Sequence, residues 1–210
     1  MDIAIIGSGN LGKALAAAAV RNGHRVTLSA AHPEHARAAA ESTGALAAES
    51  NLEAVERAEV VVLAVYSQVI VHVLDEIIDS LAGKILVDPT NPMTEDAYGP
   101  ALEGDSGAEF IQKYVPEALV VKAFNTVFAG PLANPVVDGI QLDGFVASDH
   151  DQAKSTVLQL VQSVGLRPID TGPLTMARAL EAMSLLNIQL QIRNGWPWRT
   201  AWKLLGPTGA

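Results

Sequence analysis

Short apolar runs alternate with longer stretches of helical periodicity along this 210-residue chain. Continuous apolar runs predict buried strands, and apolar positions that recur every third or fourth residue predict helices. Strands are expected at Ile3–Ile6, Arg25–Leu28, Ala45–Ala47, Val60–Val65, Ile85–Val87, Leu119–Lys122, Gln141–Ala147 and Leu166–Asp170. Helices are expected at Asn10–Asn22, Pro33–Ser42, Asn51–Arg57, Gln68–Ser80, Asp149–Val164 and Leu174–Arg193. This alternation is typical of an α/β protein with a doubly wound, mainly parallel sheet.

The regular pattern loosens after Pro89, and the Pro- and Gly-containing segment that runs to about Gly107 predicts a loop. We expect a nucleotide-binding body over residues 1–130 and a small C-terminal α/β extension over residues 131–210. The extension is expected to pack on the body, so that the two can be counted as one domain. Asp149 is expected to be the N-cap of the helix that follows it.

A glycine turn, Gly7-Ser8-Gly9-Asn10-Leu11-Gly12, joins the first predicted strand to the first predicted helix. The G-x-G-x-x-G spacing alone is a weak signal, but here a strand precedes it, a helix follows it, and a second strand comes at the expected distance. Gly7 permits a tight turn, Gly9 lets the backbone approach a pyrophosphate, and Gly12 allows close contact between helix and strand. The unpaired N–H groups at the start of the helix attract phosphates. The pattern predicts a Rossmann-type domain that binds a nicotinamide dinucleotide.

The end of the second predicted strand bears on the choice between NAD and NADP. NAD-binding domains carry a carboxylate there for the ribose 2′-hydroxyl, whereas this segment, Leu28-Ser29-Ala30-Ala31-His32-Pro33, has no acid. Ser29 can donate to a 2′-phosphate, and His32, with Arg37 a turn further on, can supply positive charge. We therefore favour NADP, although the loop has no Arg and His32 can also be an exposed residue without a ligand.

Polar, turn-like segments follow three other predicted strands, and ligands of open α/β sheets lie beyond the carboxyl ends of the strands. The segments are Tyr66-Ser67-Gln68 with Val65 before it, Asp88-Pro89-Thr90-Asn91-Pro92, and Phe124-Asn125-Thr126. Each can be explained singly as a helix cap or an Asx turn. Together, at one edge of the sheet, they indicate cofactor and substrate contacts. The predicted contacts are Val65, Tyr66, Asn91, Asn125 and Thr126.

Familiar catalytic patterns are missing from the sequence. The five histidines show no metal-ligand spacing, and neither a G-x-S-x-G elbow nor a G-x-x-x-x-G-K-[ST] loop occurs. Lys122 is a conceivable acid or oxyanion stabiliser, but a lysine at a strand end more often reaches solvent. We predict no catalytic side chain and no metal, because hydride transfer between two rings needs alignment and exclusion of water more than a proton donor.

Charge and cysteine content restrict the partners and the compartment. The formal net charge of −9 disfavours attraction to nucleic acid or to anionic membranes. The chain has no cysteine, which excludes disulfides, thiolate metal sites and a Cys nucleophile. No signal peptide is expected, and the run from Val60 to Val65 is too short to span a bilayer. We expect a cytoplasmic protein that binds a small-molecule redox cofactor, with a homodimer as a further expectation.

Four segments together resemble the NADPH:coenzyme F420 oxidoreductase family. They are the glycine turn with Lys13 after it, Asp88-Pro89-Thr90-Asn91-Pro92, Val121-Lys122-Ala123-Phe124-Asn125-Thr126, and Arg167-Pro168-Ile169-Asp170-Thr171-Gly172-Pro173-Leu174. The chain is also similar to the N-terminal cytoplasmic oxidoreductase domain of the six-transmembrane epithelial ferric reductases. The likeness runs from Met1 to about Arg193.

The resemblance implies an oxidoreductase that transfers hydride between NADPH and a deazaflavin, coenzyme F420, or a flavin. By match of motif, Ser8 to Leu11 would hold the pyrophosphate and Ser29 to His32 the 2′-phosphate. Tyr66 and Asn125 would lie near the nicotinamide. The chain departs from the family at Ala30-Ala31, where members usually carry Arg.

Two other functions stay open at this point. One is an NADP-dependent dehydrogenase or imine reductase with a small organic substrate, although such relatives usually add a long helical dimerisation domain. The other is a non-catalytic sensor that binds NADPH. The tail Trp196-Pro197-Trp198, with Trp202, can stack on a flat ring or pack in the core or a dimer contact, and packing is favoured.

Overall fold

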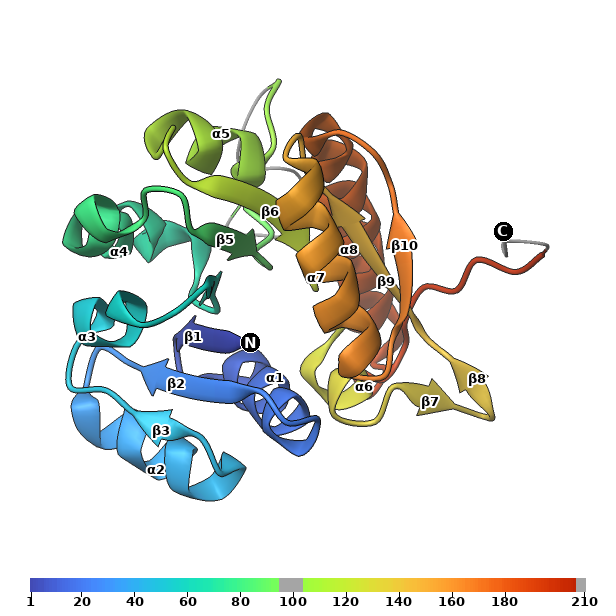
Figure 1. Cartoon of the computed structure of the whole chain (residues 1–210). Coiled ribbons are helices and arrows are strands. Elements are labelled where there is room, and N and C mark those ends of the chain that lie inside the picture. The colour runs from blue at the N-terminus through green and yellow to red at the C-terminus, as the bar shows by residue number, and fades with distance from the viewer. Residues whose placement is uncertain (95–103, 207–210) are drawn as a thin grey trace.

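Eight strands form one sheet in the computed structural model, which describes residues 1–94 and 104–206 (Figure 1). They are β1 (Asp2–Ile6), β2 (Arg25–Ser29), β3 (Leu46–Ala47), β4 (Val60–Leu63), β5 (Ile85–Asp88), β6 (Leu119–Ala123), β9 (Asp143–Ala147) and β10 (Arg167–Asp170). Their order is β10-β9-β6-β5-β4-β1-β2-β3. Strands β1 to β6 are parallel, β9 is antiparallel to β6, and β10 is parallel to β9. The predicted α/β class with a mainly parallel, Rossmann-type sheet is confirmed.

Alternate side chains of the strands enter two cores, one on each face of the sheet. Ile3 and Ile5 of β1 belong to one core, and Ala4 and Ile6 belong to the other. The first core is covered by α1 (Asn10–Arg21), α2 (Pro33–Thr43), α6 (Ala129–Ala133) and α7 (Asp151–Ser163). The second is covered by α3 (Asn51–Glu56), α4 (Ile70–Ile77) and α5 (Gly107–Tyr114). Strands buried on both faces read as continuous apolar runs, which is why the sequence pattern located them.

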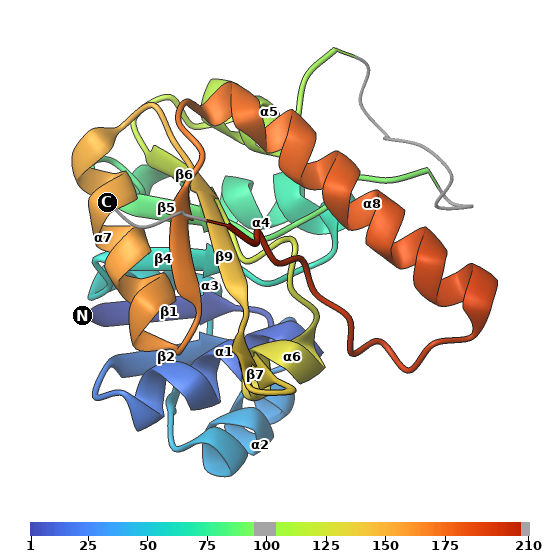
Figure 2. The same ribbon diagram turned by 90° about the vertical axis from the view of Figure 1, so that its right-hand side faces the viewer.

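The long helix α8 (Ala177–Asn194) packs against β9 through Leu180, which contacts Phe145 and Ala147. Figure 2 shows α8 as a rod outside the sheet, with the chain after it returning toward β9. Asp143 of β9 anchors this return, because its carboxylate accepts hydrogen bonds from the Lys203 ammonium (2.8 Å) and the Leu204 N–H (2.7 Å). Burial pushes the pKa of Asp143 upward, but hydrogen bonds from Arg167, Lys203 and Leu204 lower it overall. The chain between the end of α8 and Leu204 is therefore held at both of its ends.

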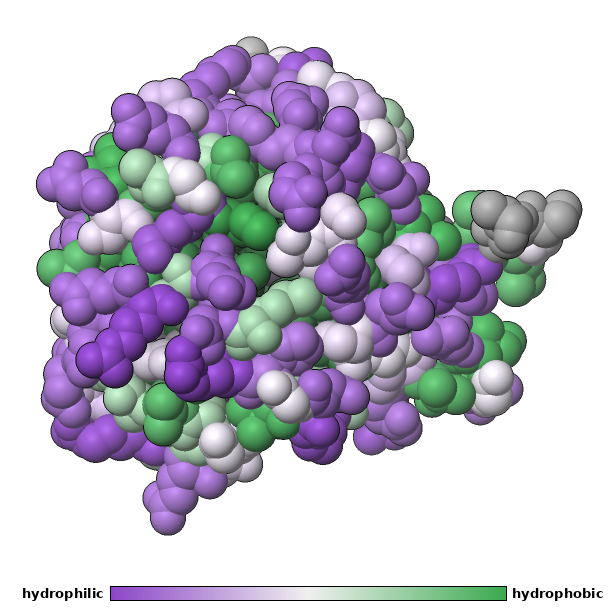
Figure 3. Space-filling view, viewed as in Figure 1, coloured by the Kyte–Doolittle hydropathy of each residue, from purple (hydrophilic) through white to green (hydrophobic). Residues whose placement is uncertain are grey.

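Three predicted elements are divided in the structure. The helix expected at 68–80 consists of a 3₁₀ turn (Ser67–Val69), α4 and a second 3₁₀ turn (Ile78–Ser80). The helix expected from Leu174 begins with a 3₁₀ turn (Leu174–Met176) before α8. The strand expected at 141–147 is two strands, since β8 (Ile140–Gln141) pairs with β7 (Val136–Val137) in a separate hairpin. Figure 3 shows hydrophobic side chains on this projecting hairpin, where Val136, Val137 and Ile140 are exposed.

Two helices were not predicted, and one cap was predicted wrongly. The helix α5 begins with a capping box in which Ser106 and Glu109 bond each other's backbone, and α6 follows β6. The N-cap of α7 is His150, not Asp149. The Asp149 carboxylate instead accepts a hydrogen bond from the Leu174 N–H at 2.9 Å, which joins the loop before α7 to the loop before α8.

The C-terminal part of the chain shares the sheet of the N-terminal part. Both β9 and β10 extend the same sheet as β1 to β6, and the division at residue 130 stays a prediction. Within residues 1–94 and 104–206, no helix is long and apolar enough to cross a membrane.

Candidate functional site

Two adjoining cavities lie beyond the carboxyl ends of the parallel strands. The first, called here the dinucleotide groove, has a volume of about 680 Å³ and is lined by the glycine turn and by the residues after β2, β4 and β5. The second, the outer cavity, has about 840 Å³ and lies between α1, the segment after β6, α8 and the C-terminal tail. The residues that line both are Asn10, Leu11, Tyr66, Pro89 and Asn91. Such volumes suit small-molecule or cofactor ligands.

The glycine turn is shaped for a phosphate group. Gly7 has a φ of +111°, and a Cβ there would lie 2.1 Å from the Ala64 carbonyl oxygen. A Cβ on Gly12 would lie 2.0 Å from the Gly7 carbonyl oxygen, so α1 can approach β1 only with glycine at this position. A Cβ on Gly9 would meet no atom within 4 Å. Gly9 is the N-cap of α1, and no side chain caps this helix, so its first N–H groups suit a pyrophosphate.

The polar side chains expected to bind a 2′-phosphate do not line the groove as predicted. The Ser29 side chain is fully buried and donates to Asn51 Oδ1 at 2.7 Å, so its hydroxyl already has a protein partner. Arg37 forms an ion pair with Glu49 at 2.6 Å. His32 is exposed and does not line the groove, whereas Ala30, Ala31 and His35 do. His35 is therefore the basic side chain that lines the groove at this end. Helix periodicity, which puts it one turn after His32, is the signal that could have found it.

Asn91, which lines both cavities, meets Asn125, which lines the outer cavity. Asn125 follows Phe124, whose backbone takes a left-handed φ of +65° at the end of β6. Asn125 Nδ2 donates to Asn91 Oδ1 at 2.9 Å, and Asn91 Nδ2 donates to the Asn125 carbonyl at 3.0 Å. Asn125 Oδ1 is buried and has no hydrogen-bond partner among the described residues. An orphaned buried acceptor costs free energy, and a carboxamide N–H₂ group, such as that of nicotinamide, would satisfy it.

The remaining predicted contacts fall in different places. Gly7, Ser8, Gly9 and Val65 line the dinucleotide groove. Tyr66 is 84% exposed and stands between the groove and the outer cavity. Thr126 is buried and lines neither cavity. Gly12 also lines neither cavity, and it packs directly against the Gly7 carbonyl of the turn. Sequence reasoning missed Lys13, Phe128 and Arg199, which line the outer cavity and follow no strand directly.

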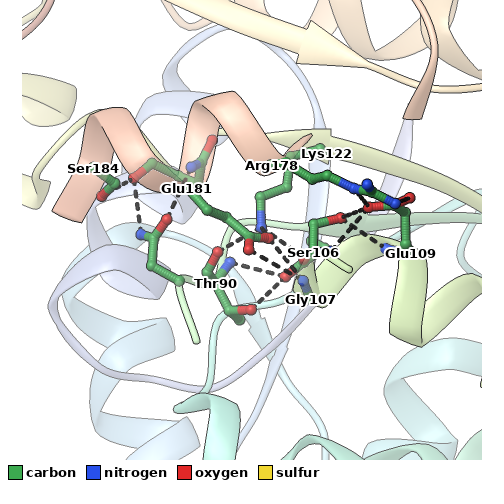
Figure 4. A network of polar contacts seen from close by, with 11 residues as sticks. Thr90, Ser106, Gly107, Glu109, Lys122, Arg178, Glu181 and Ser184 are labelled. Atoms are coloured by element: carbon green, nitrogen blue, oxygen red, sulfur yellow. Dashed lines mark hydrogen bonds and ion pairs between the residues drawn. The ribbon is translucent and has the colours of Figure 1, made fainter. Parts of the chain in front are cut away.

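Lys122 does not reach solvent, so the expectation for a lysine at this strand end was wrong. Its side chain is fully buried, and its ammonium donates to Asp88 Oδ2 (2.8 Å), the Thr90 carbonyl (2.6 Å) and Glu181 Oε1 (2.6 Å). Figure 4 shows Lys122, Thr90 and Glu181 drawn together by these bonds. The three donor positions of the ammonium are all used, and Lys122 lines neither cavity. Lys122 therefore joins β5 and β6 to α8 and is not placed to touch a substrate.

Two acids extend this network toward α5. Burial raises the pKa of the Glu181 carboxyl above its usual value, and Glu181 also accepts from the Gly107 N–H at 3.0 Å. The Arg178 guanidinium, bonded to Glu109 at 2.6 Å, lowers the pKa of Glu109 to about 2. Among residues 1–94 and 104–206, no group of three His, Cys, Asp or Glu side chains is arranged to hold a metal ion.

Comparison with known proteins identifies the family of this chain. Residues 2–92 match the family model described as NADP oxidoreductase, coenzyme F420-dependent. The F420-dependent NADP reductase of Methanothermobacter thermautotrophicus is 33% identical over 212 residues, which cover 92% of this chain and 90% of the relative. The chain belongs to the coenzyme F420-dependent NADP oxidoreductase family. It is an NADP-dependent oxidoreductase, as predicted from its sequence.

Two further comparisons show how far the likeness extends. A crystal structure from Arthrobacter sp. FB24, provisionally named an F420-dependent NADP reductase, superposes with a TM-score of 0.86 and 30% identity. The match covers 98% of this chain and 100% of that one. The metalloreductase STEAP3 of Rattus norvegicus is 32% identical over 185 residues, which cover 87% of this chain and 36% of the relative. The chain thus spans about a third of that metalloreductase and nearly the whole of the F420-dependent reductases.

Proposed function

We propose that this oxidoreductase transfers hydride between NADPH and coenzyme F420, with a flavin as the alternative acceptor. The observation that carries the proposal is the pair of adjoining cavities, which meet at Tyr66, Asn91 and the turn residues Asn10 and Leu11. Two flat rings placed in neighbouring cavities can face each other at this junction. The M. thermautotrophicus relative is named an F420-dependent NADP reductase, which supports F420 as the acceptor.

The chain's own residues would bind and align NADPH in three places. The uncapped N-terminus of α1 would hold the pyrophosphate, with Gly9 leaving room for it. His35, beside Ala30 and Ala31, would donate to the 2′-phosphate. Asn125 Oδ1 would accept from the nicotinamide carboxamide and so fix the ring's rotation. When bound, the nicotinamide supplies the hydride and the acceptor ring takes it up.

The outer cavity offers the acceptor an apolar and aromatic wall. The ring of Phe128 meets that of Trp198 edge to face, with centroids 5.2 Å apart. Phe124, Val127 and Ile188 add apolar surface to the same cavity. A planar ring system gains contact area and excludes water against such a wall, and alignment of this kind lowers the barrier of hydride transfer.

A reductase of imines or carbonyls is the second candidate, and one observation favours it. Such a reaction needs a proton donor close to the nicotinamide, and Tyr66 carries a hydroxyl at the rim of both cavities. Replacing Tyr66 by Phe separates the two candidates. Hydride transfer between rings should keep most of its rate, whereas reduction of an imine should fall by about a hundredfold or more.

The experiment that tests the proposed function is a panel of acceptors. NADPH oxidation is followed with coenzyme F420, FMN, FAD and small carbonyl and imine compounds under matched conditions. We expect fast oxidation with F420, and slow or no oxidation with the carbonyl and imine compounds. Fast oxidation with an imine alone would replace the proposal by the second candidate, and NADPH binding without oxidation by any acceptor would favour a sensor.

We further propose that two copies associate, through apolar side chains that α8 and the β7–β8 hairpin expose. Leu186 and Ile192 of α8 are 51% and 53% exposed, and Val136 and Ile140 of the hairpin are each 46% exposed. Exposed apolar side chains of this size are typical of interfaces. Size-exclusion chromatography with light scattering tests the dimer, and a monomer at all concentrations would contradict it. The cytoplasmic location stays a prediction from the sequence.

A further inference from the structure

The outer cavity contains two cationic side chains that no acid neutralises. Most lysines and arginines of the described residues form ion pairs or donate to backbone carbonyls. The exceptions, whose side chains have no ion pair and no hydrogen bond among the described residues, are Lys13, Arg57, Arg193 and Arg199. Two of them, Lys13 and Arg199, line the outer cavity. No Asp or Glu of the described residues lines it, although the chain carries a formal net charge of −9.

Lys13 and Arg199 line the cavity from segments that are far apart in the sequence. Lys13 lies in the first turn of α1, where its N–H bonds the Gly9 carbonyl at 2.9 Å, close to the expected pyrophosphate position. Arg199 lies in the C-terminal tail beyond α8. An anion bound in this cavity would be attracted by both side chains.

The tail that carries Arg199 is held on both sides of that residue. The N–H of Trp198 donates to Gln191 Oε1 at 2.9 Å. The Thr200 hydroxyl donates to Asn187 Oδ1 at 2.5 Å and accepts from Gln191 Nε2 at 2.7 Å. Asn187 and Gln191 are buried polar residues of α8, and these bonds account for their burial. The backbone around Arg199 is therefore positioned before any ligand binds, and its side chain is left to face the cavity.

We infer that the outer cavity selects an acceptor that carries an anionic side chain, phosphate or carboxylate, beside its ring, and that Lys13 and Arg199 bind that anion. The inference rests on the proposed function for the ring site, and it names the side chains that give this site its specificity. Charge-assisted hydrogen bonds to a phosphate or carboxylate are stronger than neutral ones, so an uncharged acceptor with the same ring should bind more weakly.

Equilibrium binding to the NADP⁺-loaded protein tests this inference without requiring turnover. The probes are two matched pairs: FMN and riboflavin, which differ by one phosphate, and coenzyme F420 and the same deazaflavin without its anionic side chain. Each is titrated by its own fluorescence. The first pair differs by a phosphate alone, and the second pair also differs by carboxylates. Comparing the loss of affinity in the two pairs shows which anion the cavity binds. The variants are Lys13→Gln and Arg199→Gln, with Arg57→Gln as a control that removes the same charge far from the cavity.

The anionic member of each pair should bind about tenfold or more tightly than the neutral member, and each cavity variant should reduce this advantage by about three- to tenfold. The neutral members and the Arg57→Gln control should change by less than about twofold. The inference would be overturned if the two members of a pair bound with equal affinity, or if a cavity variant weakened both members equally. It would also be overturned if no probe bound. A variant that weakens NADP⁺ binding and not FMN binding would also overturn it. Failure of the acceptor panel with these affinities intact would count against the proposed reaction and leave the anion site standing.

Discussion

Asn91, which lines both cavities, and Asn125, which lines the outer cavity, hydrogen-bond each other, and Asn125 Oδ1 has no partner among the described residues. The Asn91 side chain comes from the segment after β5, and Asn125 comes from the segment after β6. The Ser184 hydroxyl of α8 donates to the Asn125 carbonyl at 3.0 Å and adds a third support. A residue that is held by three hydrogen bonds with two neighbours and has one unpaired acceptor is suited to orient a ligand.

Replacing Asn125 by Ala should therefore reduce turnover more than NADPH affinity. Misalignment of reacting groups costs on the order of a hundredfold in rate, whereas the pyrophosphate contacts should keep the dissociation constant within about fivefold. Single-turnover oxidation of NADPH and calorimetric titration measure the two quantities. Asn134→Ala, at the exposed end of α6, is the control. Unchanged turnover in Asn125→Ala would remove Asn125 from the proposed site.

Replacing Gly9 by Val should abolish dinucleotide binding in a folded protein. Gly9 has an ordinary φ of −71°, and its Cβ would meet no protein atom within 4 Å, so the fold tolerates a side chain. That side chain would occupy the space expected for the pyrophosphate. Circular dichroism and calorimetry together test this. By contrast, Gly12→Val should lower the thermal midpoint itself, because its Cβ would collide with the Gly7 carbonyl. Retained binding in Gly9→Val would show that the turn is only structural.

Replacing His35 by Ala should reduce the preference for NADPH over NADH. Loss of one hydrogen bond to the 2′-phosphate should weaken NADPH binding by about three- to tenfold and leave NADH binding unchanged. His72→Ala is the matched control, since His72 is also exposed but lies on α4 outside the groove. Fluorescence titration with both dinucleotides gives the ratio. An equal loss of affinity for NADPH and NADH would mean that His35 does not contact the 2′-phosphate.

Lys122 should matter for stability and not for chemistry. Lys122→Met leaves Asp88 and Glu181 buried without their cation, and removing one partner of a buried ion pair costs roughly 3–5 kcal/mol. Lys113→Met, which breaks an exposed pair with Asp105, should cost less than about 1 kcal/mol. Urea unfolding measures both, and adding Glu181→Gln to Lys122→Met should recover part of the loss. Turnover per folded molecule should stay near that of the native protein. A loss of several orders of magnitude with NADPH affinity intact would indicate acid catalysis instead.

The strands and the glycine turn were predictable because each follows from a local rule. A buried parallel strand needs an apolar run, and the turn needs glycine at fixed positions. The partners of Ser29 and Lys122 were not predictable, because Asn51 and Glu181 come from distant segments that only the fold brings near. The helix α5 was missed although Ser106 and Glu109 have the spacing of a capping box. Lys13 and Arg199 were not predicted as contacts, since a cation on a helix or in a tail is usually solvated.

The transfer of deuterium from NADPH labelled at nicotinamide C4 to coenzyme F420 tests the central claim most directly. Direct transfer between rings predicts that, with the correct C4 epimer, the label is recovered on the carbon of the reduced deazaflavin that receives the hydride. The mirror epimer should transfer none, because in the proposed binding mode Asn125 fixes one face of the nicotinamide toward the outer cavity. Reduced F420 that carries solvent hydrogen with both epimers, or no reduction of F420 at all, would contradict the proposed function.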